Sequence, residues 1–238
     1  MHDIQALIFD VFGTLVDWRT SIAREVRASL GPLVAGGEDA EAFADAWRGE
    51  YQGAMEAVRA GQIPFCKLDE LHRRNLDIVL RARALDGAVD EATRAHLNLA
   101  WHRLDAWPDV AAGLARLRPR FRLAPCSNGN ISLMVNLARR NGFIWDAILG
   151  AEFARDYKPK AVVYLSAAAA FDLKPEQVLM VAAHSSDLAA AAAAGLRTAF
   201  IARPDEQGPG RGESVASVAV DWAARDLLDL AAQLGCTA

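Results

Sequence analysis

Polar side chains with catalytic potential stand directly after apolar runs of strand length in this sequence. Asp10 ends the apolar run 6–9, and Gly13 and Thr14 follow it at once. This pattern predicts a buried strand that delivers a carboxylate to a loop. In an open α/β sheet, ligands bind at the carboxyl ends of the strands, so such an aspartate is placed for chemistry. The alternative is an aspartate that only caps the following segment.

Three further predicted strand ends carry polar groups that a sheet does not need. These groups are Ser127 with Asn128, Lys158, and His184 with Asp187. The carboxyl ends of parallel strands lie along one edge, so we expect the groups to converge on Asp10. A nearby lysine would hold the Asp10 carboxylate ionised and lower its pKa.

The elements that must position these residues follow from the apolar periodicity. Helical spacing persists from about residue 18 to 105, as in Ile22, Val26 and Leu30, and no strand pattern interrupts it. Beyond Pro108, helices alternate with strands near 121–126, 147–150, 178–183 and 198–201. We therefore predict an α/β fold, in which a Rossmann-like parallel sheet with helices on both faces comprises residues 1–17 and 106–238. Residues 18–105 are predicted to be an inserted, all-helical subdomain.

Composition narrows the class of ligand. The 238 residues are 53% apolar and 24% charged, which is typical of a folded globular protein. The net charge is −4 and no basic stripe stands out, so nucleic acid is not expected and a small molecule is favoured. No apolar run reaches the length of a membrane span, and no signal peptide is expected, which predicts a cytoplasmic protein without membrane contact.

The cysteines predict neither a disulfide framework nor a zinc site. Cys66, Cys126 and Cys236 are too few and too scattered for either. Cys126 stands beside Ser127 at a strand end and could be imagined as a nucleophile. It lies within an apolar run, however, where a free cysteine usually serves as a small hydrophobic residue.

Four segments, in this order and spacing, closely resemble motifs of the haloacid dehalogenase superfamily. They are Asp10-Val11-Phe12-Gly13-Thr14, Ser127-Asn128-Gly129, Tyr157-Lys158-Pro159 and the segment around Asp187. The resemblance covers nearly the whole chain and implies that the helical insertion is a cap. Most members are phosphatases with a second aspartate two positions after the nucleophile, where this chain has Phe12. An aromatic ring cannot protonate a leaving group, and it suits a dianionic phosphate and its metal poorly.

An aromatic residue at that position resembles the L-2-haloacid dehalogenases. The resemblance implies that Asp10 attacks C2 of a short (S)- or L-2-haloalkanoate, which releases halide and leaves an aspartyl ester. Water then hydrolyses the ester to the inverted 2-hydroxy acid, without a metal or other cofactor. One alternative is a phosphatase with a degenerate Mg²⁺ site that acts on a small phosphorylated metabolite. Another is a non-catalytic binding protein, against which the joint presence of Asp10, Ser127, Lys158 and Asp187 argues.

The resemblance also implies roles for further residues. Arg48, which follows a tryptophan, would stabilise the leaving halide, although a lone helix arginine is often only solvated. Asn128 would be a second halide contact, and Ser127 with neighbouring backbone N–H groups would hold the substrate carboxylate. Thr14 would orient Asp10. Tyr164 would support the site, unless it is only a core residue.

The fourth motif departs from the dehalogenase pattern. The family typically has Ser and Asn where this chain has Ala182 and His184, whereas Asp187 is retained. His184 could replace the lost hydrogen bond, contact the halide or substrate carboxylate, position the hydrolytic water, or merely be bonded at a strand end. The resemblance suggests a homodimer, of which the sequence has no independent sign. The halogen and the chain length of the substrate are not set by these residues.

Overall fold

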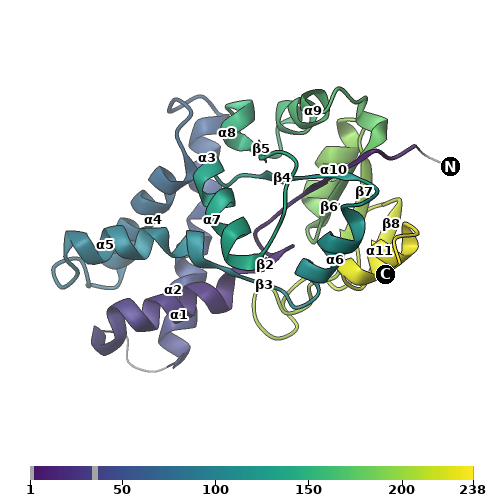
Figure 1. Ribbon diagram of the computed structural model, residues 1–238. Coiled ribbons are helices and arrows are strands. Elements are labelled where there is room, and N and C mark those ends of the chain that lie inside the picture. The colour runs from purple at the N-terminus through teal and green to yellow at the C-terminus, as the bar shows by residue number, and fades with distance from the viewer. Residues whose placement is uncertain (1–2, 34–36, 238) are drawn as a thin grey trace. The chain divides into compact units, whose positions relative to one another are not determined.

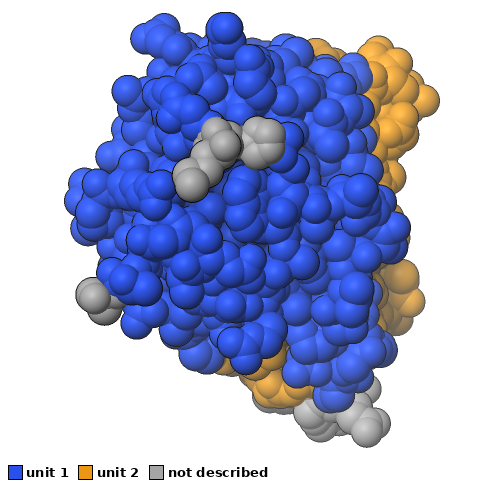
Figure 2. All heavy atoms as spheres, turned by 90° about the vertical axis from the view of Figure 1, so that its right-hand side faces the viewer, with its two compact units in different colours: residues 1–17, 105–238 blue, residues 18–104 orange. Residues whose placement is uncertain are grey.

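The computed structural model describes residues 3–33 and 37–237. The chain divides into two compact units, which Figure 2 colours separately. The first comprises residues 1–17 and 105–238, and the second comprises residues 18–104. The function of the second unit as a cap stays a prediction.

The first unit is built on a six-stranded sheet in the order β5-β4-β1-β6-β7-β8 (Figure 1). Every neighbouring pair of strands is parallel. The strands are β1 (Ala6–Phe9), β4 (Arg122–Ser127), β5 (Leu149–Gly150), β6 (Val178–Ala182), β7 (Arg197–Ile201) and β8 (Trp222–Ala224). The predicted α/β fold is confirmed. Strand β8 was not predicted, because its three residues are too few to form an apolar run of strand length.

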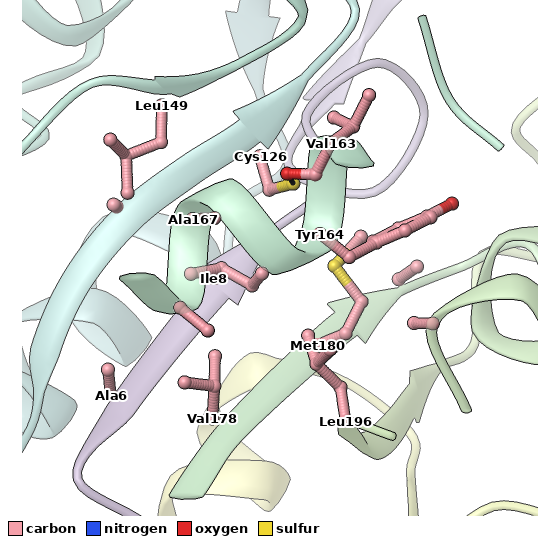
Figure 3. Packing of buried hydrophobic residues seen from close by; sticks show 14 of the residues in the cluster. Ala6, Ile8, Cys126, Leu149, Val163, Tyr164, Ala167, Val178, Met180 and Leu196 are labelled. Atoms are coloured by element: carbon pink, nitrogen blue, oxygen red, sulfur yellow. Dashed lines mark hydrogen bonds between the residues drawn. The ribbon is translucent and has the colours of Figure 1, made fainter. Parts of the chain in front are cut away.

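One face of the sheet packs against α9 (Ala161–Ala170) and α10 (Ser185–Ala193). Alternate β1 residues, Ala6 and Ile8, point into this cluster because successive side chains of a strand face opposite sides. Figure 3 shows the cluster around Ile8, with the Tyr164 ring beside Met180 and the tyrosine hydroxyl pointing outward. The cluster anchors the strands whose carboxyl ends carry the polar groups.

Right-handed crossovers place α6 (Val110–Leu117) and α7 (Ile131–Asn141) on the opposite face, because their connections run the other way along the sheet. The C-terminal helix α11 (Leu227–Gln233) packs against α6. Phe9 of β1 points to this side, where its ring lies 5.8 Å from the ring of Trp145. Helix α7 ends at Gly142, whose φ of 72° is the left-handed conformation that favours glycine. A short helix α8 (Ala151–Ala154) follows β5, and a 3₁₀ turn (Pro175–Gln177) precedes β6.

The insertion leaves and rejoins the first unit through two short paired strands. Strand β2 (Val16–Asp17) pairs antiparallel with β3 (Asp105–Ala106), and Asp17 is opposite Asp105. The sequence analysis did not predict this pair, because two-residue strands have no detectable alternation. The pairing places Asp105 in the first unit, one residue earlier than the predicted boundary.

Every regular element in the described part of the second unit is a helix. Its helices are α1 (Trp18–Leu30), α2 (Gly37–Gly49), α3 (Tyr51–Arg59), α4 (Leu68–Ala82) and α5 (Glu91–Asn98), with 3₁₀ turns at Gly31–Leu33 and Leu99–Arg103. The stripe Ile22, Val26 and Leu30 is buried. The imidazole of His72 stacks on Trp101 at 4.3 Å between ring centroids, and burial first, then Arg48 and His102, holds the pKa of His72 well below its usual value.

No helix within the described ranges has both the length and the apolar character needed to cross a bilayer.

Candidate active site

Asp10 lies in the loop directly after β1, the strand between β4 and β6. Its backbone N–H donates to the carbonyl of Val181 at 3.0 Å, which continues the ladder one residue beyond the strand. Its buried carboxylate accepts a hydrogen bond at each oxygen. Lys158 Nζ donates to Oδ1 at 2.8 Å, and Thr14 Oγ1 donates to Oδ2 at 2.7 Å. Of the groups that were predicted to converge on Asp10, Lys158 therefore contacts it directly.

Lys158 lies between two carboxylates. Its Nζ is 2.8 Å from Asp10 Oδ1 and 2.5 Å from Asp187 Oδ2. The other Asp187 oxygen accepts a hydrogen bond from the Tyr164 hydroxyl at 2.5 Å. The Lys158 backbone N–H donates to Asn128 Oδ1 at 2.9 Å, so the second and third motifs are joined directly.

These contacts determine the charge state of the nucleophile candidate. Burial by itself raises the pKa of Asp10, but the charges of Lys158 and His184 and their hydrogen bonds outweigh it and hold that pKa well below its usual value. Burial alone lowers the pKa of Lys158, and the two facing carboxylates raise it well above normal. Asp10 and Lys158 therefore form a buried ion pair at neutral pH.

Thr14 and Phe12 shape the loop that carries Asp10. Thr14 Oγ1 accepts a hydrogen bond from the backbone N–H of Ala183 at 2.9 Å, so its own hydrogen is directed to Asp10. This geometry supports an orienting role for Thr14. Phe12 is 2% exposed, and its ring packs over Gly129, where an added Cβ would lie 3.3 Å from Phe12 Cζ. The apolar ring thus borders the segment that contains Ser127 and Asn128.

Ser127 lies at the end of β4 and is fully buried. Its Oγ accepts a hydrogen bond from the Gly129 backbone N–H at 3.0 Å. That bond holds a tight turn at the strand end, which positions Asn128 toward Lys158. Binding of the substrate carboxylate by this segment stays a prediction.

The thiol of Cys126 is unsuited to nucleophilic attack. Burial, more than any nearby charge, raises its pKa to about 12, so almost no thiolate exists at neutral pH. Its weak contact is to the carbonyl of Val163, within the apolar cluster. The interpretation of Cys126 as a small core residue fits this environment.

Arg48 belongs to the second unit, near the end of α2. Its guanidinium carbon lies 3.9 Å from the centroid of the Tyr51 ring and 5.4 Å from that of Trp18. Two aromatic faces hold the guanidinium plane in place through cation–π contacts. Arg48 is thus ordered by packing within its own unit, and its predicted contact with a halide stays a prediction.

His184 contacts the nucleophile candidate. Its Nδ1 is 3.2 Å from Asp10 Oδ2, and its Nε2 is 2.9 Å from Glu206 Oε2. Burial opposes protonation, but hydrogen bonds to Asp10 and Glu206 raise the pKa of His184 to about 10. While Asp10 is a carboxylate, the His184 ring is therefore an imidazolium at neutral pH.

Two buried neighbours of the site, Glu206 and Arg203, were not predicted from the sequence. Both lie in the Gly- and Pro-rich loop that follows β7, and both are buried. Arg203 makes a bidentate pair with Asp109, with both N–O distances 2.8 Å, and its Nε donates to the carbonyl of Thr14 at 2.9 Å. The position of this loop at the carboxyl end of a strand could have indicated that its residues lie near the site. The Gly- and Pro-rich composition of the loop, however, suggests a solvated connection.

No group of three or more His, Cys, Asp or Glu side chains in the described part of the chain is arranged to hold a metal ion. A metal-independent reaction stays a prediction.

Gly13 is required by two independent features of the nucleophile loop. Its φ is +86°, and an added Cβ would lie 2.1 Å from Glu206 Oε1. We expect Gly13→Ala to displace the Glu206 carboxylate, to destabilise the protein by about 1–3 kcal/mol and to lower activity strongly. Urea unfolding and a turnover assay measure the two effects.

The matched control for this substitution is Gly61→Ala. Gly61 also has a positive φ, +70°, but an added Cβ would meet nothing within 4 Å. Its variant should show the backbone strain of about 1 kcal/mol without the loss of activity. Equal activity losses in both variants would show that displacement of the Glu206 carboxylate has no specific effect on activity.

The fold and site define a class of enzyme in which an aspartate, kept ionised by a lysine, stands at the end of a central parallel strand. The haloacid dehalogenase-like hydrolase family matches residues 4–195, and the chain belongs to this family.

Comparison with individual proteins gives more specific similarities than the family match. The chain is 30% identical to (S)-2-haloacid dehalogenase 1 of Pseudomonas sp. (strain CBS-3), over 85% of this chain and 86% of that protein. It is 44% identical to a defluorinating L-2-haloacid dehalogenase of known crystal structure, which covers 98% of this chain and 95% of that one at a TM-score of 0.93. A second L-2-haloacid dehalogenase structure is 45% identical, covering 98% of this chain and 100% of that one at a TM-score of 0.91.

Proposed function

We propose that this protein is a hydrolase that removes halide from short (S)- or L-2-haloalkanoic acids, with Asp10 as the nucleophile. The observation that carries the proposal is the Asp10 carboxylate, buried and ionised beside Lys158, with Phe12 two residues further on. The similar proteins described above are named as dehalogenases of this specificity. The phosphatase alternative is less well supported, because Phe12 cannot protonate a leaving group.

In the first step, one Asp10 oxygen forms a bond to C2 while the carbon–halogen bond breaks and its electron pair leaves with the halide. Attack opposite the leaving group inverts C2. Asn128 accepts a hydrogen bond at Oδ1, so its amide NH₂ is the end that can donate to an anion. We assign halide stabilisation to Asn128 and Arg48, and substrate carboxylate binding to Ser127 with adjacent N–H groups.

In the second step, water attacks the carbonyl carbon of the Asp10 ester. Negative charge then develops on the carbonyl oxygen, and Lys158 Nζ, 2.8 Å from Oδ1 in the resting site, is placed to stabilise it. Asp187 and Tyr164 hold the lysine in that position through two hydrogen bonds in series. Collapse of the tetrahedral intermediate expels the 2-hydroxy acid and restores the Asp10 carboxylate.

A direct test compares halide release from L- and D-2-chloropropionate and chloroacetate with phosphate release from p-nitrophenyl phosphate, each with and without EDTA. We expect L-2-chloropropionate to react about 100-fold or more faster than its enantiomer, because misplacement by about 1 Å has that effect. EDTA should not change the rate. Metal-dependent phosphate release without halide release would instead establish the phosphatase alternative.

A single turnover with enzyme in excess, in water enriched in heavy oxygen, tests the covalent route within the same assay. The hydroxyl oxygen of the first product should be unlabelled, because it comes from Asp10. Labelled product in the first turnover would mean that water attacks C2 directly.

A cytoplasmic location and a homodimer stay predictions from the sequence and the resemblance.

A further inference from the structure

His184 connects the nucleophile to a second buried acid. Its Nδ1 is 3.2 Å from Asp10 Oδ2 and its Nε2 is 2.9 Å from Glu206 Oε2. Glu206 is 3% exposed and is held against the nucleophile loop at Gly13. The Asp10–His184–Glu206 chain fixes both the orientation of the imidazole and the nitrogen that faces the reacting carboxyl group.

This geometry places His184 on the nucleophile side of the reaction. In-line displacement puts the attacking oxygen and the halide on opposite sides of C2, so a group in contact with Asp10 Oδ2 is far from the leaving halide. Both ring nitrogens already face an acid, because Nδ1 faces Asp10 and Nε2 faces Glu206. Of the roles that the sequence left open, contact with the halide is therefore the one that the geometry disfavours.

The first chemical step changes the charge around His184. The charged groups that act on its ring are Asp10, from the loop after β1, and Glu206, from the loop after β7. Their hydrogen bonds and charges raise the pKa of His184 to about 10, against the effect of burial. Alkylation of Asp10 removes one of the two negative charges, and the pKa of His184 must then fall.

We propose that His184, positioned by Glu206, is the general base that takes a proton from the water that hydrolyses the Asp10 ester. The proposal rests on the proposed function. His184 Nδ1 lies 3.2 Å from Asp10 Oδ2, so a water that approaches the carboxyl carbon of Asp10 from the side of the imidazole meets Nδ1 within hydrogen-bond reach.

Asp187 is less suited to this task. Its two oxygens accept hydrogen bonds of 2.5 Å from Lys158 and Tyr164, so its electron pairs are engaged by strong donors. It is joined to Asp10 only through the lysine. Asp187 therefore serves to position Lys158, whereas the imidazole touches the reacting group.

The proton balance closes over one turnover. After halide leaves, the imidazolium releases one proton to solvent. Neutral His184 then takes a proton from water as the new oxygen–carbon bond forms at Asp10 Cγ, and returns it to the alkoxide of the departing 2-hydroxy acid. The Asp10 carboxylic acid that remains protonates His184, which restores the resting pair. The net products are hydroxy acid, halide and the single proton that the hydrolysis requires.

The test separates the two chemical steps in the full-length enzyme. His184→Gln and Glu206→Gln are mixed with L-2-chloropropionate, halide is followed at early times, and the intact protein mass is recorded. We expect His184→Gln to release about one equivalent of chloride rapidly and then to slow ester hydrolysis about 100-fold or more. The ester should accumulate as a protein mass increased by the haloacid less hydrogen chloride. Glu206→Gln should also release chloride rapidly and accumulate the ester, with a smaller decrease in the rate of ester hydrolysis.

The pH profile is the readout that a merely structural role would not change. In the wild-type enzyme, the rate of ester hydrolysis should rise with pH, because His184 loses its proton while Asp10 is esterified. His184→Gln should lack this rise. The matched control is His96→Gln, an exposed histidine of the second unit, which should behave as wild type. Thermal melting confirms that each variant is folded, and Glu206→Asp should recover part of the rate.

Two outcomes would overturn the proposal. One is a chloride burst that is slowed as much as steady turnover, with no ester in the mass spectrum. The other is ester hydrolysis in both variants at the wild-type rate and pH dependence. If the wild-type enzyme releases no halide from any haloacid, the proposed function has failed instead, and the two failures are thus distinguished.

Discussion

Asp10→Asn is expected to eliminate halide release, with a decrease in kcat of about 10⁴-fold or more, as for removal of other covalent nucleophiles. An uncharged amide cannot displace halide as a carboxylate does. The amide also places an NH₂ group where one carboxylate oxygen stood. Lys158, Thr14 and His184 all contact the carboxylate oxygens of Asp10 in the wild-type protein. Chloride release under saturating L-2-chloropropionate measures the effect.

Asp172→Asn is the matched control for that substitution. Asp172 is exposed and has a φ of 55°, a conformation that asparagine adopts readily. It should retain wild-type activity and stability. Chloride release by Asp10→Asn at a rate comparable with this control would show that the nucleophile has been misassigned.

The second large effect is expected for Lys158→Met. Lys158 separates the buried carboxylate of Asp10 from the half-buried carboxylate of Asp187, and its removal leaves them near one another without that cation. Breaking a buried ion pair from one side costs about 3–5 kcal/mol. We expect a loss of that order in the free energy of unfolding at neutral pH, measured with urea, and a decrease in turnover of about 1000-fold or more.

The pH dependence of this loss has a defined sign. The folded-state pKa of Asp10 is lowered, so its stabilising contribution is present above the unfolded-state pKa of about 3.9 and is lost as pH falls toward the folded-state pKa. The pKa of Lys158 is raised, so its contribution is present below about 10.4 and is lost as pH rises through the folded-state pKa. The difference between wild type and variant should thus be greatest between about pH 4 and 10 and decrease in stronger acid.

Lys158→Met should also move the acid limb of kcat/KM to higher pH, because the main cationic partner that lowers the pKa of Asp10 is gone. Lys160→Met provides the control. That lysine is 44% exposed and pairs with Asp156, so its loss should change stability by about 0.5 kcal/mol or less. Equal destabilisation in the two variants would contradict the importance of the buried pair.

Much of the fold could be predicted, because the core strands are local apolar runs. The runs that became β1, β4, β6 and β7 are fully buried over most of their length. The missed strands β2, β3 and β8 have two or three residues each. Strands this short exist through their partners, so their own residues contain too little pattern to detect.

The reaction class followed from very few residues of the sequence. Asp10 and Lys158 indicated the superfamily, which the family match confirms. Phe12 indicated which chemistry the aspartate can perform, and the similar proteins are named as dehalogenases, in agreement with that reaction class. These signals are local, because a motif residue lies next to the strand or turn that positions it. The assembly of Asp10, Lys158 and Asp187 was predictable for the same reason, since parallel strands bring their carboxyl ends to one edge.

The role of His184, by contrast, was left open by the sequence and is narrowed only by tertiary structure. Its partner Glu206 comes from a loop 22 residues further along the chain, whose composition resembles an ordinary connection. Which way an imidazole points, and which acid returns to meet it, depends on packing of the whole loop against Gly13 and Thr14. The sequence thus predicted Asp10 as the nucleophile and indicated the reaction class, whereas only the folded chain revealed the buried acid beside the imidazole of His184.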